Sequence, residues 1–297
     1  MSIEESVLPA ELILQVMGHL HDVADKNTLL SFSLLGKIFQ KDAQRRLFSS
    51  VELQYAIANP SLIQDVSTKA GNFLRTLNDN PKLAEYVHSF TLCLLDWSGW
   101  SVHFRPGATV YTILPQLTHL STFSITGTSK RSNDVYWSSE SLPVKLLQLV
   151  EMTLRTRNIE SLSLTAPLIF PTNFIASCLT LKNLTLSTDS FRFPLHAVSP
   201  DIQAGPPIYL TSLVLQTGIR HRPTYMADFI AFFNPLLCPL SLSRLTCLDI
   251  SGCKASFLNN LLTLLSICPH DLQTLVLPIP PGGMFILWSN LETLLIS

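Results

Sequence analysis

The stretch "LTCLDISGC", residues 245–253, carries the pattern that decides the fold. Its apolar residues follow the order apolar-x-x-apolar-x-apolar and end on Leu248 and Ile250. The alternation at this end has a period of two, which is typical of a β-strand with one buried face. The stretch therefore predicts a strand that turns Leu248 and Ile250 into a core and its other side chains outward.

The same pattern recurs through the rest of the chain, in which leucine accounts for 54 of 297 residues. Its copies lie roughly 20 to 40 residues apart, which is the range of stacked repeats. Between them we expect helices or loops, such as a helix over 257–268. The eight copies are 87–92 "VHSFTL", 120–125 "LSTFSI", 159–164 "IESLSL", 181–186 "LKNLTL", 210–215 "LTSLVL", 245–250 "LTCLDI", 272–277 "LQTLVL" and 291–296 "LETLLI".

These copies resemble the leucine-rich repeat, a family in which each strand joins a parallel sheet along a curved solenoid. Cys253 stands three residues past Ile250, where that family has Asn or Cys, and Asp189 holds the equivalent place after 181–186. Four other copies depart from the family at this position, so the repeats are degenerate: they have Thr128, Pro167, Gly218 and Pro280. An unrelated sheet protein with leucine-rich strands is the alternative.

The residues ahead of the repeats, 6–48, predict a unit of three short helices. Pro9 suits the first helical position, where its missing N–H is no loss. A second helix is expected over 28–39 and a third from about Gln40. The first strand follows at 49–53, so we expect an α/β chain with a helical unit at 6–48 and a repeat domain at 49–297.

This helical unit resembles an F-box. The family begins with Leu-Pro-x-Glu-Leu/Ile, and its second helix carries Leu-x-x-x-Ser-Leu followed by Lys/Arg and an aromatic residue. Gly36 departs from the Cys that many members have, and a glycine costs about 1 kcal/mol in a helix interior. The stretch 78–92 is also similar to the start of the repeat region in many fungal F-box proteins. The matching residues are Leu8, Pro9, Glu11, Leu12, Ile13, Val16, Met17, Leu20, Leu30, Ser33, Leu34, Leu35, Lys37 and Phe39.

The resemblance implies a substrate receptor of a cullin–RING (SCF-type) ubiquitin ligase, acting in ubiquitin-dependent degradation. Its partners would be the SCF adaptor, a cullin through that adaptor, and an unknown protein substrate. Met17 and Leu34 would serve the internal core of the unit. The alternative is a scaffold without ligase coupling, in which the helices only cap the repeats. The adaptor-binding residues implied are Leu8, Pro9, Leu12, Ile13, Val16, Leu20 and Leu30.

In a leucine-rich-repeat solenoid the variable residues of each strand line the concave face. Here that face would be rich in hydroxyl groups and nearly uncharged, without the arginine cluster that recognises phosphate. It would recognise a protein target through hydrogen bonds and shape complementarity. The target-binding residues predicted on it are Ser161, Ser163, Lys182, Asn183, Thr185, Thr211, Ser212, Thr246, Asp249, Gln273 and Thr274.

Composition and motifs bear on the function class. The formal net charge is −1, so there is no basic field for nucleic acid. No phosphate-binding loop, nucleophile elbow or paired metal ligands appear, so we expect no enzyme and no cofactor. The most apolar stretch, 229–242, is broken by prolines and shorter than the ~20 residues of a membrane span.

The termini and cysteines suggest where the protein works. The acidic start "MSIEESV" does not match a secretory signal. The six cysteines are scattered, so we expect reduced thiols and a cytoplasmic or nuclear protein. The last copy, 291–296, is followed only by Ser297. We therefore expect the array to lack a C-terminal cap, so that the chain is either a truncated product of a longer receptor or relies on another molecule there.

Overall fold

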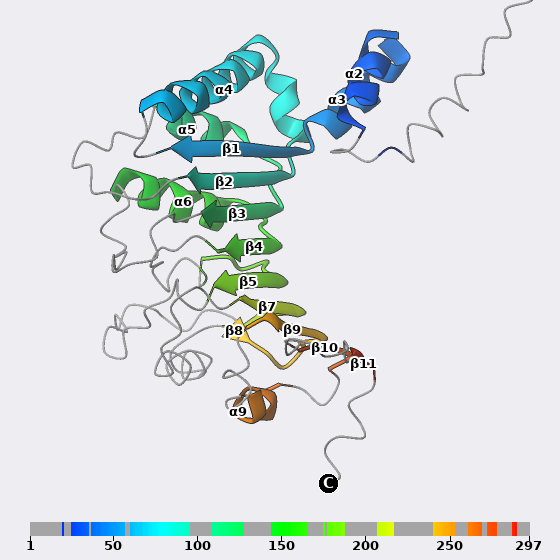
Figure 1. Ribbon diagram of the computed structural model, residues 1–297, viewed down its shortest axis with the longest axis vertical. Helices are drawn as coiled ribbons and strands as arrows, with labels where there is room; N and C mark the ends of the chain where they lie inside the picture. Colours follow the sequence, from blue (N-terminus) through cyan, green and yellow to red (C-terminus); the bar gives the residue numbers. More distant parts are fainter. Residues whose placement is uncertain are drawn as a thin grey trace, which may run out of the picture.

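A single large sheet runs along the molecule in this computed structural model (Figure 1). The structure describes residues 20, 25–35, 37–56, 60–95, 108–127, 144–165, 175, 177–187, 207–216, 240–253, 261–268, 272–277 and 287–289. The sheet has nine strands, which follow one another in chain order across it. They are β1 (Ser50–Ala56), β2 (Ser89–Leu95), β3 (Thr122–Gly127), β4 (Ser161–Leu164), β5 (Asn183–Ser187), β7 (Ser212–Gln216), β9 (Cys247–Gly252), β10 (Thr274–Val276) and β11 (Leu287–Ser289).

The strands from β1 to β10 are parallel to their neighbours, and only β11 is antiparallel to β10. A second, two-stranded parallel sheet joins β6 (Ile208–Tyr209) to β8 (Leu240–Ser241). The chain is therefore an α/β protein with a mostly parallel sheet, as the sequence predicts. Seven of the eight copies of the pattern form strands, and the eighth, 291–296, lies outside the described residues.

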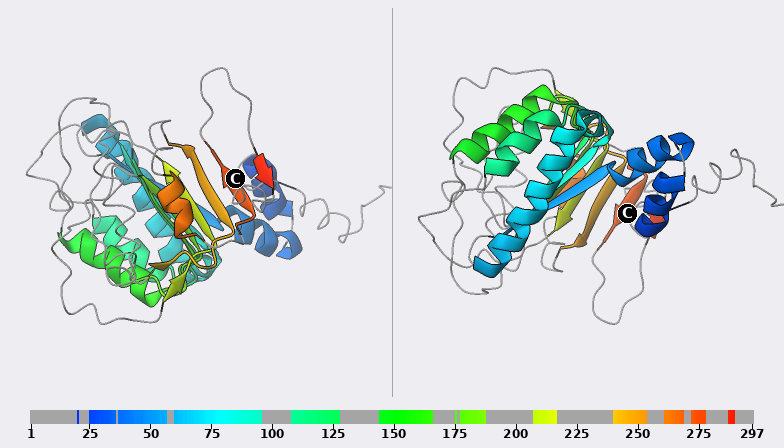
Figure 2. Two further views of the ribbon diagram at one scale, coloured as in Figure 1. Left: turned by 90° about the horizontal axis from the view of Figure 1, so that it is seen from below. Right: turned by 90° about the horizontal axis from the view of Figure 1, so that it is seen from above.

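Helices cover one face of the large sheet, and Figure 2 shows α4, α5 and α6 together on that side. Helices are expected there because the connection between two parallel strands has to carry the chain back to the end of the sheet at which the next strand begins. The expected helix at 257–268 is confirmed over a shorter range. The helices after the first strand are α4 (Pro60–Asp79), α5 (Ala108–Ile113), α6 (Val144–Thr156) and α9 (Leu261–Ser266), with 3₁₀ turns η1 (Pro81–Tyr86) and η2 (Leu114–Gln116).

The core lies between the sheet and these helices. In the strands of the large sheet from β2 to β10 the residues with the period-two spacing are buried, and they are aligned across the sheet by its register. Each such Leu or Phe contributes about 1.5–3 kcal/mol on burial. One aligned row consists of Phe90, Phe123, Leu162, Leu184, Leu213, Leu248 and Leu275.

A repeated backbone contact fixes the start of successive strands. The carbonyl of Ser49 accepts hydrogen bonds from the N–H groups of both His88 and Ser89. The same double contact recurs from strand to strand through the carbonyls of His88, Ser121, Glu160, Lys182, Thr211 and Thr246. Because every buried backbone group needs a partner, this contact holds each strand in register with the preceding one.

The helices ahead of the sheet have a small core of their own. α2 (Lys26–Leu35) and α3 (Lys37–Leu47) enclose Leu29 and Ala43, with Leu20, Phe32, Phe39 and Leu47 packed against them. The prediction that the second helix extends to Phe39 was wrong, because residues 37–39 belong to α3. A glycine is a poor helix former, so the sequence at Gly36 favours a boundary between helices.

Candidate functional site

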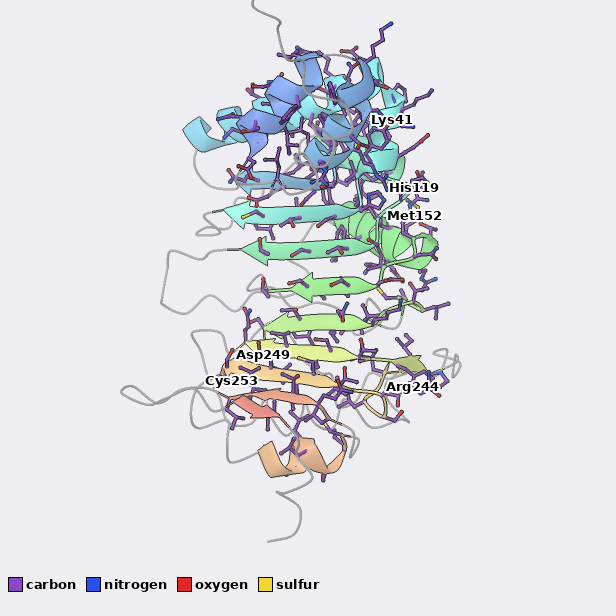
Figure 3. The ribbon with its side chains drawn as sticks, turned by 90° about the vertical axis from the view of Figure 1, so that its right-hand side faces the viewer. Lys41, His119, Met152, Arg244, Asp249 and Cys253 are labelled. Atoms are coloured by element: carbon purple, nitrogen blue, oxygen red, sulfur yellow. The ribbon has the colours of Figure 1, made fainter. Side chains whose placement is uncertain are left out.

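One face of the large sheet is left open by α4, α5 and α6, and Figure 3 looks onto it. We call it the open face. Two rows of side chains cross it in register. The first row is Ser50, Ser89, Thr122, Ser161, Asn183, Ser212, Cys247 and Thr274. The middle row is Glu52, Thr91, Ser124, Ser163, Thr185, Val214, Asp249 and Val276.

These rows form because a strand turns alternate side chains to opposite faces. On β4, for example, Leu162 and Leu164 are buried while Ser161 and Ser163 are partly exposed. Neighbouring parallel strands lie about 4.8 Å apart, so each row is a line of side chains at that spacing. The result is a regular array of small polar groups.

Within the residues that the structure describes, most hydroxyl groups of the two rows have no side-chain hydrogen-bond partner. Within the described part of the chain, none of them is the donor or acceptor of a side-chain hydrogen bond. Each Ser or Thr hydroxyl can donate one hydrogen bond and accept two, so the array can bind a polar partner. The residues concerned are Ser89, Thr91, Thr122, Ser124, Ser161, Ser163, Thr185, Ser212 and Thr274.

The residues that precede each strand are already engaged. The hydroxyl of Thr246 donates to the carbonyl of Thr211 (3.0 Å), and that of Thr211 donates to the carbonyl of Lys182 (3.2 Å). The Lys182 ammonium forms an ion pair with Glu160 (2.9 Å), with both side chains about half exposed. These residues hold adjacent strands together and leave little fixed charge at this edge.

All eleven predicted target-binding residues lie either in the two rows of the open face or directly before its strands. Seven of them lie in the two rows: Ser161, Ser163, Asn183, Thr185, Ser212, Asp249 and Thr274. The other four, Lys182, Thr211, Thr246 and Gln273, directly precede strands. Their role in target binding stays a prediction.

Sequence reasoning missed Glu52, which continues the middle row onto β1 opposite Thr91. The stretch 49–53 was expected to be a strand, and its alternation of Val51 and Leu53 with polar residues was the signal that could have placed Glu52 on the open face. The carboxylate oxygen Oε1 of Glu52 accepts a weak contact from the Gln54 amide at 3.4 Å.

A second candidate surface lies on α2. Leu30 and Leu34 are four residues apart, so they share one face of the helix. Leu30 is 46 % exposed and Leu34 is 86 % exposed. The expectation that Leu34 serves the internal core was therefore wrong: Leu29, on another face, fills that core instead.

The remaining predicted adaptor-binding residues divide into two groups. Leu20 is partly buried against the small core of α2 and α3, and its carbonyl accepts a hydrogen bond from Arg46 at 3.2 Å. Its side chain thus helps to hold the helical unit together. Leu8, Pro9, Leu12, Ile13 and Val16 lie outside the described residues.

Reactive groups are scarce on the described surface. Burial raises the pKa of the Cys178 thiol to about 12 and that of Cys268 to about 11, which disfavours the nucleophilic thiolate. The five described cysteines are free thiols. Among the described residues, no three His, Cys, Asp or Glu side chains are grouped to bind a metal ion.

No described helix has the length and apolar character to cross a membrane.

No family model, curated protein or solved structure matches this chain.

Proposed function

We propose that this protein is the substrate-recognition subunit of an SCF-type cullin–RING ubiquitin ligase. In this proposal an F-box-like unit, 6–48, binds the adaptor. A solenoid of degenerate leucine-rich repeats, 49–297, binds the protein to be ubiquitinated. The chain itself is a receptor and not an enzyme.

The observation that carries the proposal is the exposed apolar face of α2. The side chains of Leu30 and Leu34 are exposed on one face of α2. The other side of the helix packs into its own small core around Leu29. Isolated exposed apolar residues are common, but two on one helical face within an F-box-like sequence are suited to docking against another protein. An aromatic pair, Phe32 and Phe39 with ring centroids 6.5 Å apart, keeps α2 and α3 fixed for that contact.

The repeat assignment has separate support. Eight parallel strands follow one another across the sheet in chain order, apart from the two strands of the small sheet. The buried Cys253 lies where the repeat family has Asn or Cys, and its thiol contacts the Leu215 carbonyl of β7 at 3.4 Å. A side chain at this position that satisfies the backbone of the preceding strand fits a stacked-repeat architecture.

The proposal is tested by capture of the adaptor and cullin with the tagged full chain in fungal cells. The wild-type chain should retain both, and Leu30→Asp/Leu34→Asp should lose both, because a charge buried at an apolar interface costs several kcal/mol. Met152→Asp, a matched change of a half-exposed apolar residue on α6, should retain them. Absence of adaptor and cullin from the wild-type capture would favour the scaffold alternative, with the helices acting only as a cap.

A further inference from the structure

The middle row of the open face has a carboxylate near each end and uncharged side chains between them. Glu52 lies on β1. Asp249, which Figure 3 labels, lies on β9. Between these two residues the row contains Thr91, Ser124, Ser163, Thr185 and Val214. The charge pattern along this row is therefore negative, neutral, negative.

The length of the row matches an extended peptide. Six strand-to-strand steps separate Glu52 from Asp249, which at ~4.8 Å per step is roughly 29 Å. An extended chain rises ~3.3 Å per residue, so about nine residues reach from one carboxylate to the other.

Resting on the proposed role of this face in target binding, we propose that it binds an extended target segment lying across the strands. The segment is uncharged and polar in its middle and has a basic side chain at each end. The hydroxyls of Ser124, Ser163 and Thr185 pair with its polar groups, and the two carboxylates pair with its basic ends.

The same row disfavours a phosphorylated target. A phosphate carries close to two negative charges and is recognised by Arg or Lys. The described residues of the first and middle rows include no Arg, Lys or His. The neighbouring Lys182 is already paired with Glu160. A phosphate placed over the middle of the row would lose water without gaining a counter-charge, so recognition here does not require phosphorylation of the target.

A hydroxyl-rich face also suits a neutral polysaccharide. The two carboxylates decide between these partners, because a neutral glycan has no cation to place against Glu52 and Asp249. A peptide with basic ends can pair with both carboxylates as well as with the hydroxyl groups between them.

The inference is tested with fluorescent peptide pools and the full chain, by fluorescence polarisation. Each pool has a middle of about nine residues drawn from Ser, Thr, Asn, Gln and Gly, flanked by Lys in one pool and by Glu in the other. The best Lys-flanked peptides should bind at least about tenfold more tightly than their Glu-flanked counterparts, because like charges repel at both ends. A phosphoserine at the centre should weaken binding by about tenfold.

Two variants locate the contact. Glu52→Gln and Asp249→Asn should each weaken the Lys-flanked peptides about three- to fivefold, which is the range of an exposed ion pair. The double variant should remove the preference for Lys. Glu85→Gln, the same change at an exposed residue of η1 outside the row, should leave the affinity unchanged. Circular dichroism checks that each variant is folded.

The inference is overturned by equal affinity for both pools or by a Kd weaker than about 1 mM for every peptide. It is also overturned if a neutral glucan binds with an affinity that Glu52→Gln and Asp249→Asn leave unchanged. Adaptor capture through α2 is an independent readout. If the adaptor binds and the peptides do not, this inference alone fails. If the peptides bind and the adaptor does not, the ligase role fails while the peptide site stands.

Discussion

Phe90 on β2 and Phe123 on β3 stack inside the core, with ring centroids 6.0 Å apart and ring planes inclined by 17°. The two residues are direct partners in the strand register, and both side chains are fully buried. Aromatic pairs of this kind add about 0.5–1.5 kcal/mol beyond the burial of their surface. The stack is therefore a central contact between β2 and β3.

Phe123→Ala should lower the free energy of unfolding by about 3–5 kcal/mol, because it opens a cavity where the two rings meet. The shift of the urea midpoint measures this loss. Met152→Ala removes a half-exposed side chain of α6 and should change the stability by no more than about 0.5 kcal/mol. A loss below about 1 kcal/mol for Phe123→Ala would show that the stack is not part of a packed core.

Replacement by alanine at two glycines should change the free energy of unfolding in opposite directions. A Cβ on Gly252 would lie 3.1 Å from Cγ and 3.3 Å from Cα of Gln216, beside the register shift between β7 and β9. Gly252→Ala should therefore destabilise the protein by about 0.5–1 kcal/mol, because the backbone of Gln216 has to move by a few tenths of an ångström. A Cβ on Gly71, in α4, meets nothing within 4 Å, so Gly71→Ala should stabilise by about 0.5–1 kcal/mol. Thermal unfolding that gives both variants the same sign would contradict the close approach of β9 to β7.

The buried Cys178 should make stability fall in mild alkali. Its pKa is raised from 9.0 to about 12 by burial, so above pH 9 the unfolded chain loses the thiol proton while the folded chain keeps it. The unfolded state then binds fewer protons, and stability decreases as pH rises from 9 towards 12. At pH 10 the decrease is on the order of 1 kcal/mol for this one thiol.

The measurement compares urea unfolding at pH 8 and pH 10 for the wild-type chain and for Cys178→Ala. Other groups titrate in this range in both proteins, so only the difference between the two pH responses reports on Cys178. The variant should lose less stability between pH 8 and pH 10. Parallel responses would mean that the Cys178 thiol is open to solvent.

Much of the sheet could be predicted because its signal is local. The period-two alternation in stretches such as 245–250 depends only on which side chains face the core, and seven stretches of this kind form strands. The helix α4 was not predicted, although Ala70, Leu74 and Leu77 follow a helical spacing. Its sequence lies between the helical unit 6–48 and the first copy of the repeat pattern, 87–92, where the strand pattern gives no information.

The rest depends on contacts that the sequence does not contain. The pairing of Glu52 with Thr91 joins residues in strands separated by the whole of α4, so the row could not be completed from the repeat pattern alone. The exposure of Leu34 likewise depends on how α3 packs against α2. A helical pattern identifies apolar positions, but only the packing decides that Leu29 is buried and Leu34 is exposed.

The central claim, that the F-box-like unit 6–48 docks onto an SCF adaptor, is tested most directly by isothermal titration calorimetry of a purified SCF adaptor with the full chain. The account predicts a one-to-one complex with a negative heat-capacity change, because apolar surface is buried. Leu34→Asp should weaken it by at least about tenfold, since a charge would enter that interface, and Met152→Asp should not. No binding by the wild-type chain, or equal binding by wild type and Leu34→Asp, would contradict the account.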